Sequence, residues 1–355
     1  MPLASDLDRY LTELEQHELF SGVVRITRGE VELYARALGY ANRSWMSENS
    51  LETRFDTASI TKLFTAVATL ELIDQGAFAF DTRVIDYLDL EGTAISREVT
   101  VFHLLTHSSG IGDDCEEENG EIYEELWRCK PNYAVITTAD FLPQFVHKPA
   151  NFPPGAGCRY CNCGYILLGL AIEQATGLSY REVIRECIFK PAGMVDSEFL
   201  RMDRVHENVA EGSDPIRDAA GEVVAWKKNI YSFPPIGSPD SGAQVTAADL
   251  DRFLRAVKTG DLCSRELADA FFMPQVHYRT YDTWIKMYGY GMWFHVDRDQ
   301  EVVYCEKEGI NAGVSGVIRH YPAGDINVVI LSNMESGVWQ PLRQIADLVV
   351  ADQLA

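Results

Sequence analysis

The β-forming residues of this 355-residue chain gather at its two ends, and a long stretch of different character separates the two groups. Near the start, Val24, Ile26, Val31 and Leu33 fall in two short runs around a turn at residues 28–30, which predicts a hairpin. From about residue 285 the pattern returns, in the stretches YGYGMWFHV, EVVYCEK, GVSGVIRHYP and INVVILSNM. Strands from both ends are therefore expected to pair in one antiparallel sheet.

Helices are expected around and between these strands. The first 20 residues have an acidic amphipathic pattern, and a second helical pattern lies near the end in PLRQIADLVVADQL. The predicted fold class is α+β, an antiparallel sheet flanked by N- and C-terminal helices with a mostly helical inserted domain. We expect residues 1–79 and 226–355 to form the sheet domain and residues 80–225 to form the helical domain.

One lysine disturbs an otherwise apolar helical pattern, FDTASITKLFTAVATLELIDQG. Lys62 follows Ser59 by three residues, so that the two side chains share a helix face. Desolvation in apolar surroundings lowers the pKa of a lysine, and a neutral amine can take the proton of a serine hydroxyl. The alternative is a serine that caps a helix, followed by a lysine whose ammonium reaches solvent.

Several further segments that follow the Ser59 helix are informative when taken in order. The helix with Ser59 is followed by VTVFHLLTHSSGI, then FPPGAGCRYCNCGYILLGLAIEQATG, PAGMVDS, SGAQVTAADLDRFL and YGYGMWF. In this order they resemble the serine β-lactamase-like superfamily, with its class C β-lactamases, D-alanyl-D-alanine carboxypeptidases and related esterases and amidases. The resemblance implies a β-lactamase/transpeptidase-like fold with the active site at the interface of the two domains.

The resemblance also assigns roles to individual residues. Ser59 is the expected nucleophile, and Tyr160 of the Y-x-N motif is an expected general base once positive charge lowers its pKa. Asn162 is expected to bind substrate and to hold Lys62. A second Y-x-N, Tyr40 to Asn42, is expected to be structural.

The third motif of the superfamily, K-T-G or H-x-G on a strand six residues before a glycine, is harder to place. If Gly316 is that glycine, Ile310, Asn311 and Ala312 occupy the motif, without lysine or histidine. This absence counts against carboxylate-bearing substrates. The amides of Ser59 and Gly313 are then the expected oxyanion donors, with a side-chain hydrogen bond from Asn311.

Other chemistry-bearing residues are given structural roles. His103, His107 and Asp113 invite a metal or triad interpretation, but the resemblance places them at a supporting helix end. His320 and Asp325 lie beside a turn, which accounts for the aspartate. Cys158, Cys161 and Cys163 could supply three thiolates, yet no second pair follows at zinc spacing, so buried thiols are favoured. We expect no metal and no cofactor, and leave open whether Cys161 faces the pocket.

Charge and hydropathy limit the partners. The formal net charge of -22 disfavours nucleic acid and anionic membranes, which need basic surfaces. No apolar run approaches a transmembrane length, and no secretion signal is visible, so a cytoplasmic location is the expectation.

The predicted function is a serine hydrolase that acts through an acyl-enzyme on a small ester or amide. A carboxylesterase or a small amide or peptide hydrolase is favoured over a β-lactamase or a D-amino-acid-specific peptidase. The alternative of another class is a catalytically silent member that binds a ligand or acts as a scaffold. The oligomeric state is left open.

Overall fold

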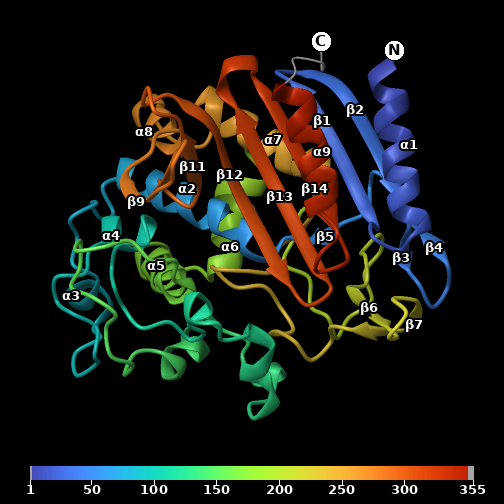
Figure 1. The fold of residues 1–355 in the computed structure, drawn as a ribbon. Coiled ribbons are helices and arrows are strands. Elements are labelled where there is room, and N and C mark those ends of the chain that lie inside the picture. Colours follow the sequence, from blue (N-terminus) through green and yellow to red (C-terminus); the bar gives the residue numbers. More distant parts are fainter. Residues whose placement is uncertain (1, 351–355) are drawn as a thin grey trace.

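The computed structural model describes residues 2–350, and its centre is one antiparallel sheet built from both ends of the chain (Figure 1). The strand order is β2-β1-β14-β13-β12-β11-β10-β9. The bounds are β1 Gly22–Arg28, β2 Val31–Leu38, β9 Val276–Thr280, β10 Ile285–Tyr288, β11 Trp293–Val296, β12 Val302–Asn311, β13 Val314–Tyr321 and β14 Ile326–Ser332. The predicted sheet is confirmed, and β1 from the start of the chain pairs with β14 from near its end.

The two terminal helices lie together on one face of the sheet. They are α1 (Pro2–Gln16) and α9 (Trp339–Val350), so the predicted terminal helices are confirmed and the last predicted turn of the second lies outside the described residues. Leu7, Leu11 and Ile345 are buried against Val24 and Ile330 of the sheet. Because side chains alternate between the faces of a strand, Val23 and Leu331 join a different core on the opposite face.

That opposite face is covered by α2 (Thr61–Asp74), α7 (Ala247–Thr259) and α8 (Arg265–Phe271). The remaining helical part contains α3 (Val84–Leu88), α4 (Val101–Leu105), α5 (Asn162–Thr176) and α6 (Tyr180–Ile184), together with short 3-10 turns. It also contains a small hairpin, β6 (Ser213–Arg217) and β7 (Val223–Lys228). The predicted domain boundary at residue 226 falls inside β7, and the two-domain division itself stays a prediction.

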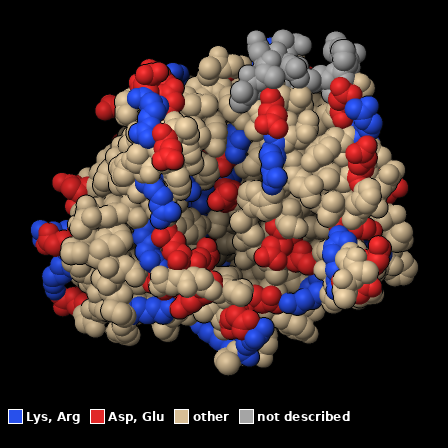
Figure 2. All heavy atoms as spheres, in the orientation of Figure 1, with Lys and Arg blue, Asp and Glu red and all other residues tan. Residues whose placement is uncertain are grey.

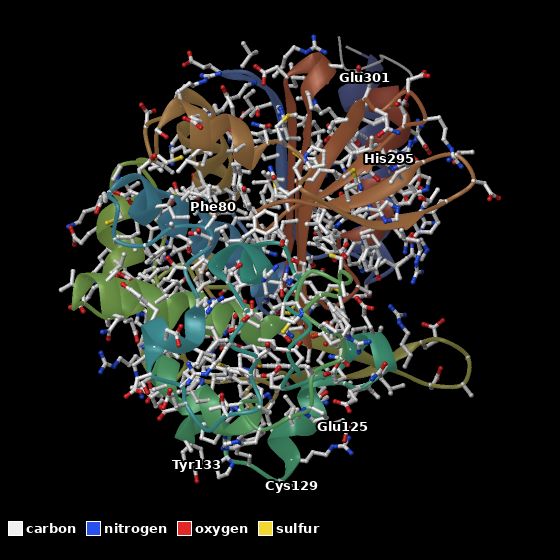
Figure 3. All side chains as sticks on the ribbon, turned by 90° about the vertical axis from the view of Figure 1, so that its left-hand side faces the viewer. Phe80, Glu125, Cys129, Tyr133, His295 and Glu301 are labelled. Carbon is white, nitrogen blue, oxygen red and sulfur yellow. The ribbon has the colours of Figure 1, made fainter. Side chains whose placement is uncertain are left out.

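The sheet and the helical part meet through apolar contacts. Phe80, labelled in Figure 3, stacks on Tyr290 with ring centroids 5.3 Å apart, and Phe102 packs edge-on against both rings. Figure 2 shows that the face turned to the viewer in Figure 1 is hollowed near its centre, with acidic and basic atoms in the walls of the hollow.

Two features of the sheet matter for the site. Strand β11 pairs with β12 only as far as Glu306, so that the end of β12, residues 307–311, has a free edge on that side. The short strand β5 (Phe55–Asp56) pairs with β8 (Gln244–Val245) and leads into the 3-10 turn η1 (Ala58–Ile60) at the start of α2. No described helix combines the length and the apolar character needed to cross a membrane.

Candidate active site

Ser59 lies on η1, the 3-10 turn that precedes α2, rather than within the α-helix that the sequence pattern predicts from residue 55. The residue is half-buried. The reason for the turn lies in its contacts with β12, because Gly309 packs directly against it. A Cβ on Gly309 would lie 2.1 Å from the carbonyl oxygen of Thr57 and 3.0 Å from the amide nitrogen of Ser59. The nucleophile and the free edge of β12 are thereby held side by side.

Lys62 is fully buried, with 0% exposure. Its Nζ donates to Ser59 Oγ at 3.1 Å, to Asn162 Oδ1 at 2.8 Å and to the carbonyl oxygen of Asp240 at 2.8 Å. Burial lowers the pKa of Lys62, although Asp240 and Glu117 partly offset that effect. The solvent-reaching alternative considered for this lysine is therefore wrong.

Tyr160 completes the group around the serine. Its hydroxyl donates to Ser59 Oγ at 2.7 Å, and Lys62 Nζ lies 5.0 Å from the centre of its ring. Burial, and then the charge of Glu117, raise the pKa of Tyr160 well above its ordinary value. The expected lowering of this pKa is therefore wrong, and the phenol is a proton donor in the free protein.

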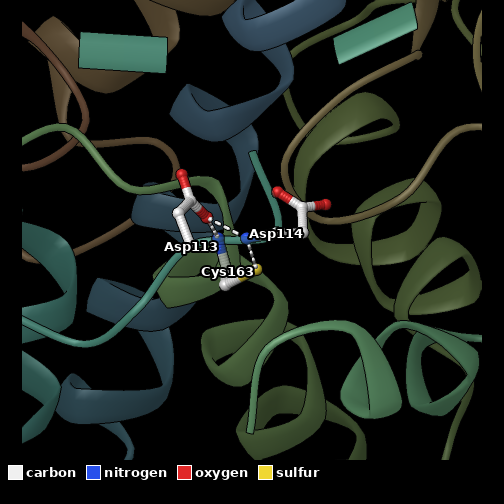
Figure 4. Close-up of side chains that lie close together, drawn as sticks. All are labelled: Asp113, Asp114 and Cys163. Carbon is white, nitrogen blue, oxygen red and sulfur yellow. Dashed lines mark hydrogen bonds between the residues drawn. The ribbon is translucent and has the colours of Figure 1, made fainter. Parts of the chain in front are cut away.

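The Tyr160–Asn162 segment is held in place by its neighbours. Buried Asp113 accepts hydrogen bonds from the amides of Asn162 and Cys163, both at 2.9 Å, and so caps the first turn of α5; Figure 4 shows the bond to Cys163. The Nδ1 atom of His107 accepts from the Cys161 amide at 3.1 Å, and its ring packs 4.7 Å from that of Tyr160. Burial lowers the pKa of His107 well below its ordinary value, which keeps the imidazole neutral.

Asp113, Asp114 and Cys163 place potential metal-ligand atoms within 4.8 Å of one another. Their chemistry fits a helix cap better than a cation site. Both oxygens of Asp113 accept backbone amides, and the Cys163 sulfur accepts from the Asp114 amide at 3.2 Å. Burial raises the pKa of the Asp114 carboxyl and of the Cys163 thiol well above their ordinary values, which favours their neutral forms.

The remaining candidates lie in structural contacts. His103 forms a capping box with Thr100 at the start of α4. The Nδ1 atom of His320 is hydrogen-bonded to Asn327, and Asp325 pairs with Lys258. The half-buried Cys158 contacts the Thr106 carbonyl, Cys161 is buried, and Tyr40 lies in the small strand β3 (Tyr40–Asn42).

Sequence reasoning missed Lys307, on the free end of β12. It is 3% exposed, and its Nζ lies 3.4 Å from the Tyr160 hydroxyl and 4.4 Å from the centre of the Tyr160 ring. Burial and the nearby charge of Lys62 lower the pKa of Lys307 well below its ordinary value. Tyr160 therefore has a second amine, that of Lys307, beside its hydroxyl.

Lys307 corrects the placement of the third motif. Counting six residues back from Gly313, instead of from Gly316, gives Lys307, Glu308 and Gly309, a K-x-G sequence. Gly309 and Gly316 are instead cross-strand partners in the β12–β13 hairpin. The conclusion that the motif lacks a basic residue is therefore wrong.

The expected oxyanion role of Gly313 is also wrong. Its amide donates to Asp214 Oδ2 at 2.5 Å and is not free to hold an oxyanion. The Nδ2 atom of Asn311 lies 3.4 Å from Ser241 Oγ, which places Asn311 on the same side of β12 as Lys307; its contact with substrate stays a prediction.

Two exposed carboxylates border the group around Ser59. Glu117 Oε1 accepts from Asn162 Nδ2 at 3.2 Å, and Glu118 Oε1 accepts from the Tyr160 amide at 3.2 Å. Glu117 is also one of the charges that act on the pKa values of Lys62, Tyr160 and Lys307. The approach to the serine is therefore acidic.

Comparison with known proteins follows this geometry. The family model for Beta-lactamase matches residues 7–351. Esterase EstB of Burkholderia gladioli is 29% identical over 294 residues, 76% of this chain and 74% of the esterase. A D-aminopeptidase of Cereibacter sphaeroides is 33% identical over 221 residues, 59% of this chain and 40% of that protein. The solved penicillin binding protein from Bacillus halodurans has a TM-score of 0.86 and 35% identity, and covers 95% of this chain and 99% of its own.

Proposed function

The chain belongs to the Beta-lactamase family, and from this membership and the contacts of Ser59 we propose that it is a serine hydrolase that acts through an acyl-enzyme. The observation that carries the proposal is that Lys62 Nζ and the Tyr160 hydroxyl both lie within hydrogen-bond distance of Ser59 Oγ. A serine hydroxyl needs such a base to become a nucleophile at neutral pH.

In the proposed reaction, Ser59 Oγ attacks the carbonyl carbon while its proton passes to neutral Lys62. The negative oxygen that forms is held by the Ser59 amide and by a backbone N–H on the free edge of β12. When the bond to the leaving group breaks, Tyr160 supplies the proton that this group needs and regains one from the lysines. Water then attacks the Ser59 ester, which releases the acid and restores the serine.

For the substrate, we propose an amide or short peptide whose acyl group carries a free amine. Glu117 and Glu118 border the serine, so that a protonated amine is attracted and a carboxylate is repelled. The absence of a basic residue from the third motif no longer argues against β-lactams, because Lys307 occupies it. The case against β-lactams therefore rests on the charges of Glu117 and Glu118. Likeness to a D-aminopeptidase supports the same class.

A carboxylesterase is the second candidate. Likeness to esterase EstB over three quarters of the chain supports it. The proposal of a silent binding or scaffold member loses its only support, because the third motif contains Lys307.

Matched chromogenic substrates test the proposal. We expect aminoacyl p-nitroanilides to be hydrolysed faster than their N-acetylated forms, p-nitrophenyl esters to give a burst of p-nitrophenol, and nitrocefin to be a poor substrate. Glu117→Gln should reduce the ratio of the rate on the free amine to the rate on the acetylated amine about two- to fivefold, because Glu117 is exposed. Glu125→Gln is the control, because Glu125, labelled in Figure 3, is exposed, pairs with Arg128 and is not among the main charges that act on Lys62, Tyr160 or Lys307.

The results separate the candidates. Equal rates for free and acetylated amines would refute the amine proposal and leave the hydrolase. Good turnover of esters alone would favour the esterase. Absence of any burst in the intact protein, together with ligand binding, would favour the silent member.

A further inference from the structure

The residue before the nucleophile has an unusual backbone conformation. Ala58 has a φ of +42° and is fully buried, in a small cluster with Phe233 and Val314. A left-handed conformation costs an L-residue with a side chain about 1–2 kcal/mol, so the surrounding structure has to hold it. Because Ser59 comes next in the chain, this turn fixes the direction of its side chain.

Hydrogen bonds to one other segment, at Gly242 and Ala243, hold most of the turn. The Thr57 amide donates to the carbonyl oxygen of Ala243 at 2.9 Å, and the Ala243 amide donates to Thr61 Oγ1 at 3.0 Å. These bonds fix the residues on either side of Ala58. The amide of Ala58 itself donates to Asp56 Oδ1 at 2.7 Å. The Ala58 carbonyl oxygen accepts from the Gly242 amide at 3.4 Å, and the carboxylate of Asp56 is the side-chain group that holds the left-handed residue.

The surroundings of Asp56 make this contact sensitive to protonation. Burial raises the pKa of Asp56 to about 6, and the hydrogen bond from Ala58 acts in the opposite direction. The carboxylate borders a cavity of about 360 Å³ that does not include Ser59, Lys62 or Tyr160 among its lining residues. Such a cavity is large enough to hold water, which gives protons a route to Asp56.

Other titratable groups line the same two spaces as Asp56. Those in the cavity are Arg201, Arg204, His206, Glu211 and Lys228, and Tyr123 shares a second, smaller space with Asp56. Arg201 pairs with Asp203, and Lys228 pairs with Glu211. The pKa of Asp56 is set by its burial and by Ala58, not by any of these charges.

We propose that Asp56 is a positioning residue for the nucleophile: its ionised carboxylate holds the Ala58 amide, and through this turn it keeps Ser59 aligned with Lys62 and Tyr160. The inference rests on the proposed function, since it concerns the rate at which Ser59 is acylated. A neutral carboxyl accepts a weaker hydrogen bond than a carboxylate does. The acylation rate therefore falls as the pH drops through about 6, because the turn then holds Ser59 less firmly in line with Lys62 and Tyr160.

Two substitutions separate charge from hydrogen bonding. Asp56→Asn keeps an acceptor oxygen without the charge, and Asp56→Ala removes the acceptor. With a fluorophosphonate probe at mildly alkaline pH, we expect the labelling rate to fall about tenfold in Asp56→Asn and further, about a hundredfold, in Asp56→Ala. The fall in rate near pH 6 should be absent from Asp56→Asn. Asp140→Asn is the control, since Asp140 accepts two backbone amides at another turn.

Outcomes of this experiment are distinct. An Asp56→Ala protein that is labelled at the wild-type rate overturns the inference, as does an Asp56→Asn protein that keeps the wild-type fall near pH 6. If Asp56→Ala does not fold, the asparagine variant and its pH profile decide alone. A wild-type protein that is never labelled overturns the proposed function instead.

Discussion

Replacement of Lys62 by methionine should remove activity with little change in stability. Methionine has a similar length and no charge. When Lys62 is protonated, its ammonium makes three hydrogen bonds in the folded protein, and hydrogen bonds to charged groups contribute about 1.5–3 kcal/mol each, or about 4.5–9 kcal/mol in total. Burial of an ammonium costs several kcal/mol. The acceptors are neutral atoms, so no bare charge remains, and we expect a net change in unfolding free energy within about 2 kcal/mol of zero.

The effect on catalysis should be much larger. Loss of a general base costs about 10²–10⁴ in rate, which corresponds to about 3–5.5 kcal/mol in the activation barrier. Lys62→Arg should be equally slow, because arginine keeps its proton at all ordinary pH values. The two variants therefore distinguish the need for a neutral amine from the need for a positive charge.

The pH dependence of stability gives a second measure of the same residue. Since the pKa of Lys62 is lowered in the folded state, the unfolded chain binds more protons at any pH between that value and the ordinary value of 10.5. The unfolding free energy of the wild type should therefore rise with pH through this window. The methionine variant should lack that rise.

Urea unfolding and the burst of p-nitrophenol from an activated ester measure the two quantities. A Lys62→Met protein that acylates at the wild-type rate would contradict the assigned role of the amine. A loss of more than about 4 kcal/mol in unfolding free energy would show that the lysine is mainly a structural residue.

The remaining predictions concern strand β12. Lys307→Met should slow acylation about a hundredfold, because the Lys307 amine lies 3.4 Å from the Tyr160 hydroxyl and is one of the groups proposed to return its proton; this is the lower end of the range for loss of an acid–base group. The matched variant Lys286→Met, on the neighbouring strand, should stay within about threefold of the wild type; a Lys307→Met protein as fast as this control would refute the assignment. Gly309→Ala should destabilise the fold by about 1–3 kcal/mol or more and slow labelling of the serine, because its Cβ would lie 2.1 Å from the Thr57 carbonyl oxygen. Unchanged melting temperature and labelling rate would show that this contact relaxes freely.

The features that the sequence predicts correctly are those that depend on residues close together in the chain. Alternating β-forming residues at both chain ends predict the sheet, and the three-residue spacing of Ser59 and Lys62 predicts their contact because one turn of helix brings them together. The order of the motifs brings Tyr160 to the same place. All three are now adjacent in the structure.

The features that it misses depend on the tertiary structure. Two glycines, Gly313 and Gly316, can each anchor the third motif in the sequence, and only the hairpin register shows that Gly316 faces Gly309 across the strands. The sequence alone therefore does not assign Lys307 to the third motif. The protonation of Tyr160 is another case, because it depends on burial and on Glu117, which belongs to a separate segment.

The central claim, that Ser59 is the acylated residue, is tested most directly by mass spectrometry of the protein quenched during turnover of an activated ester or aminoacyl anilide. The account predicts one added acyl mass on the intact chain, located on the peptide that contains Ser59, and no such mass in Ser59→Ala. An acyl group found on any other residue, or an unmodified Ser59 while product accumulates at the wild-type rate, would contradict it.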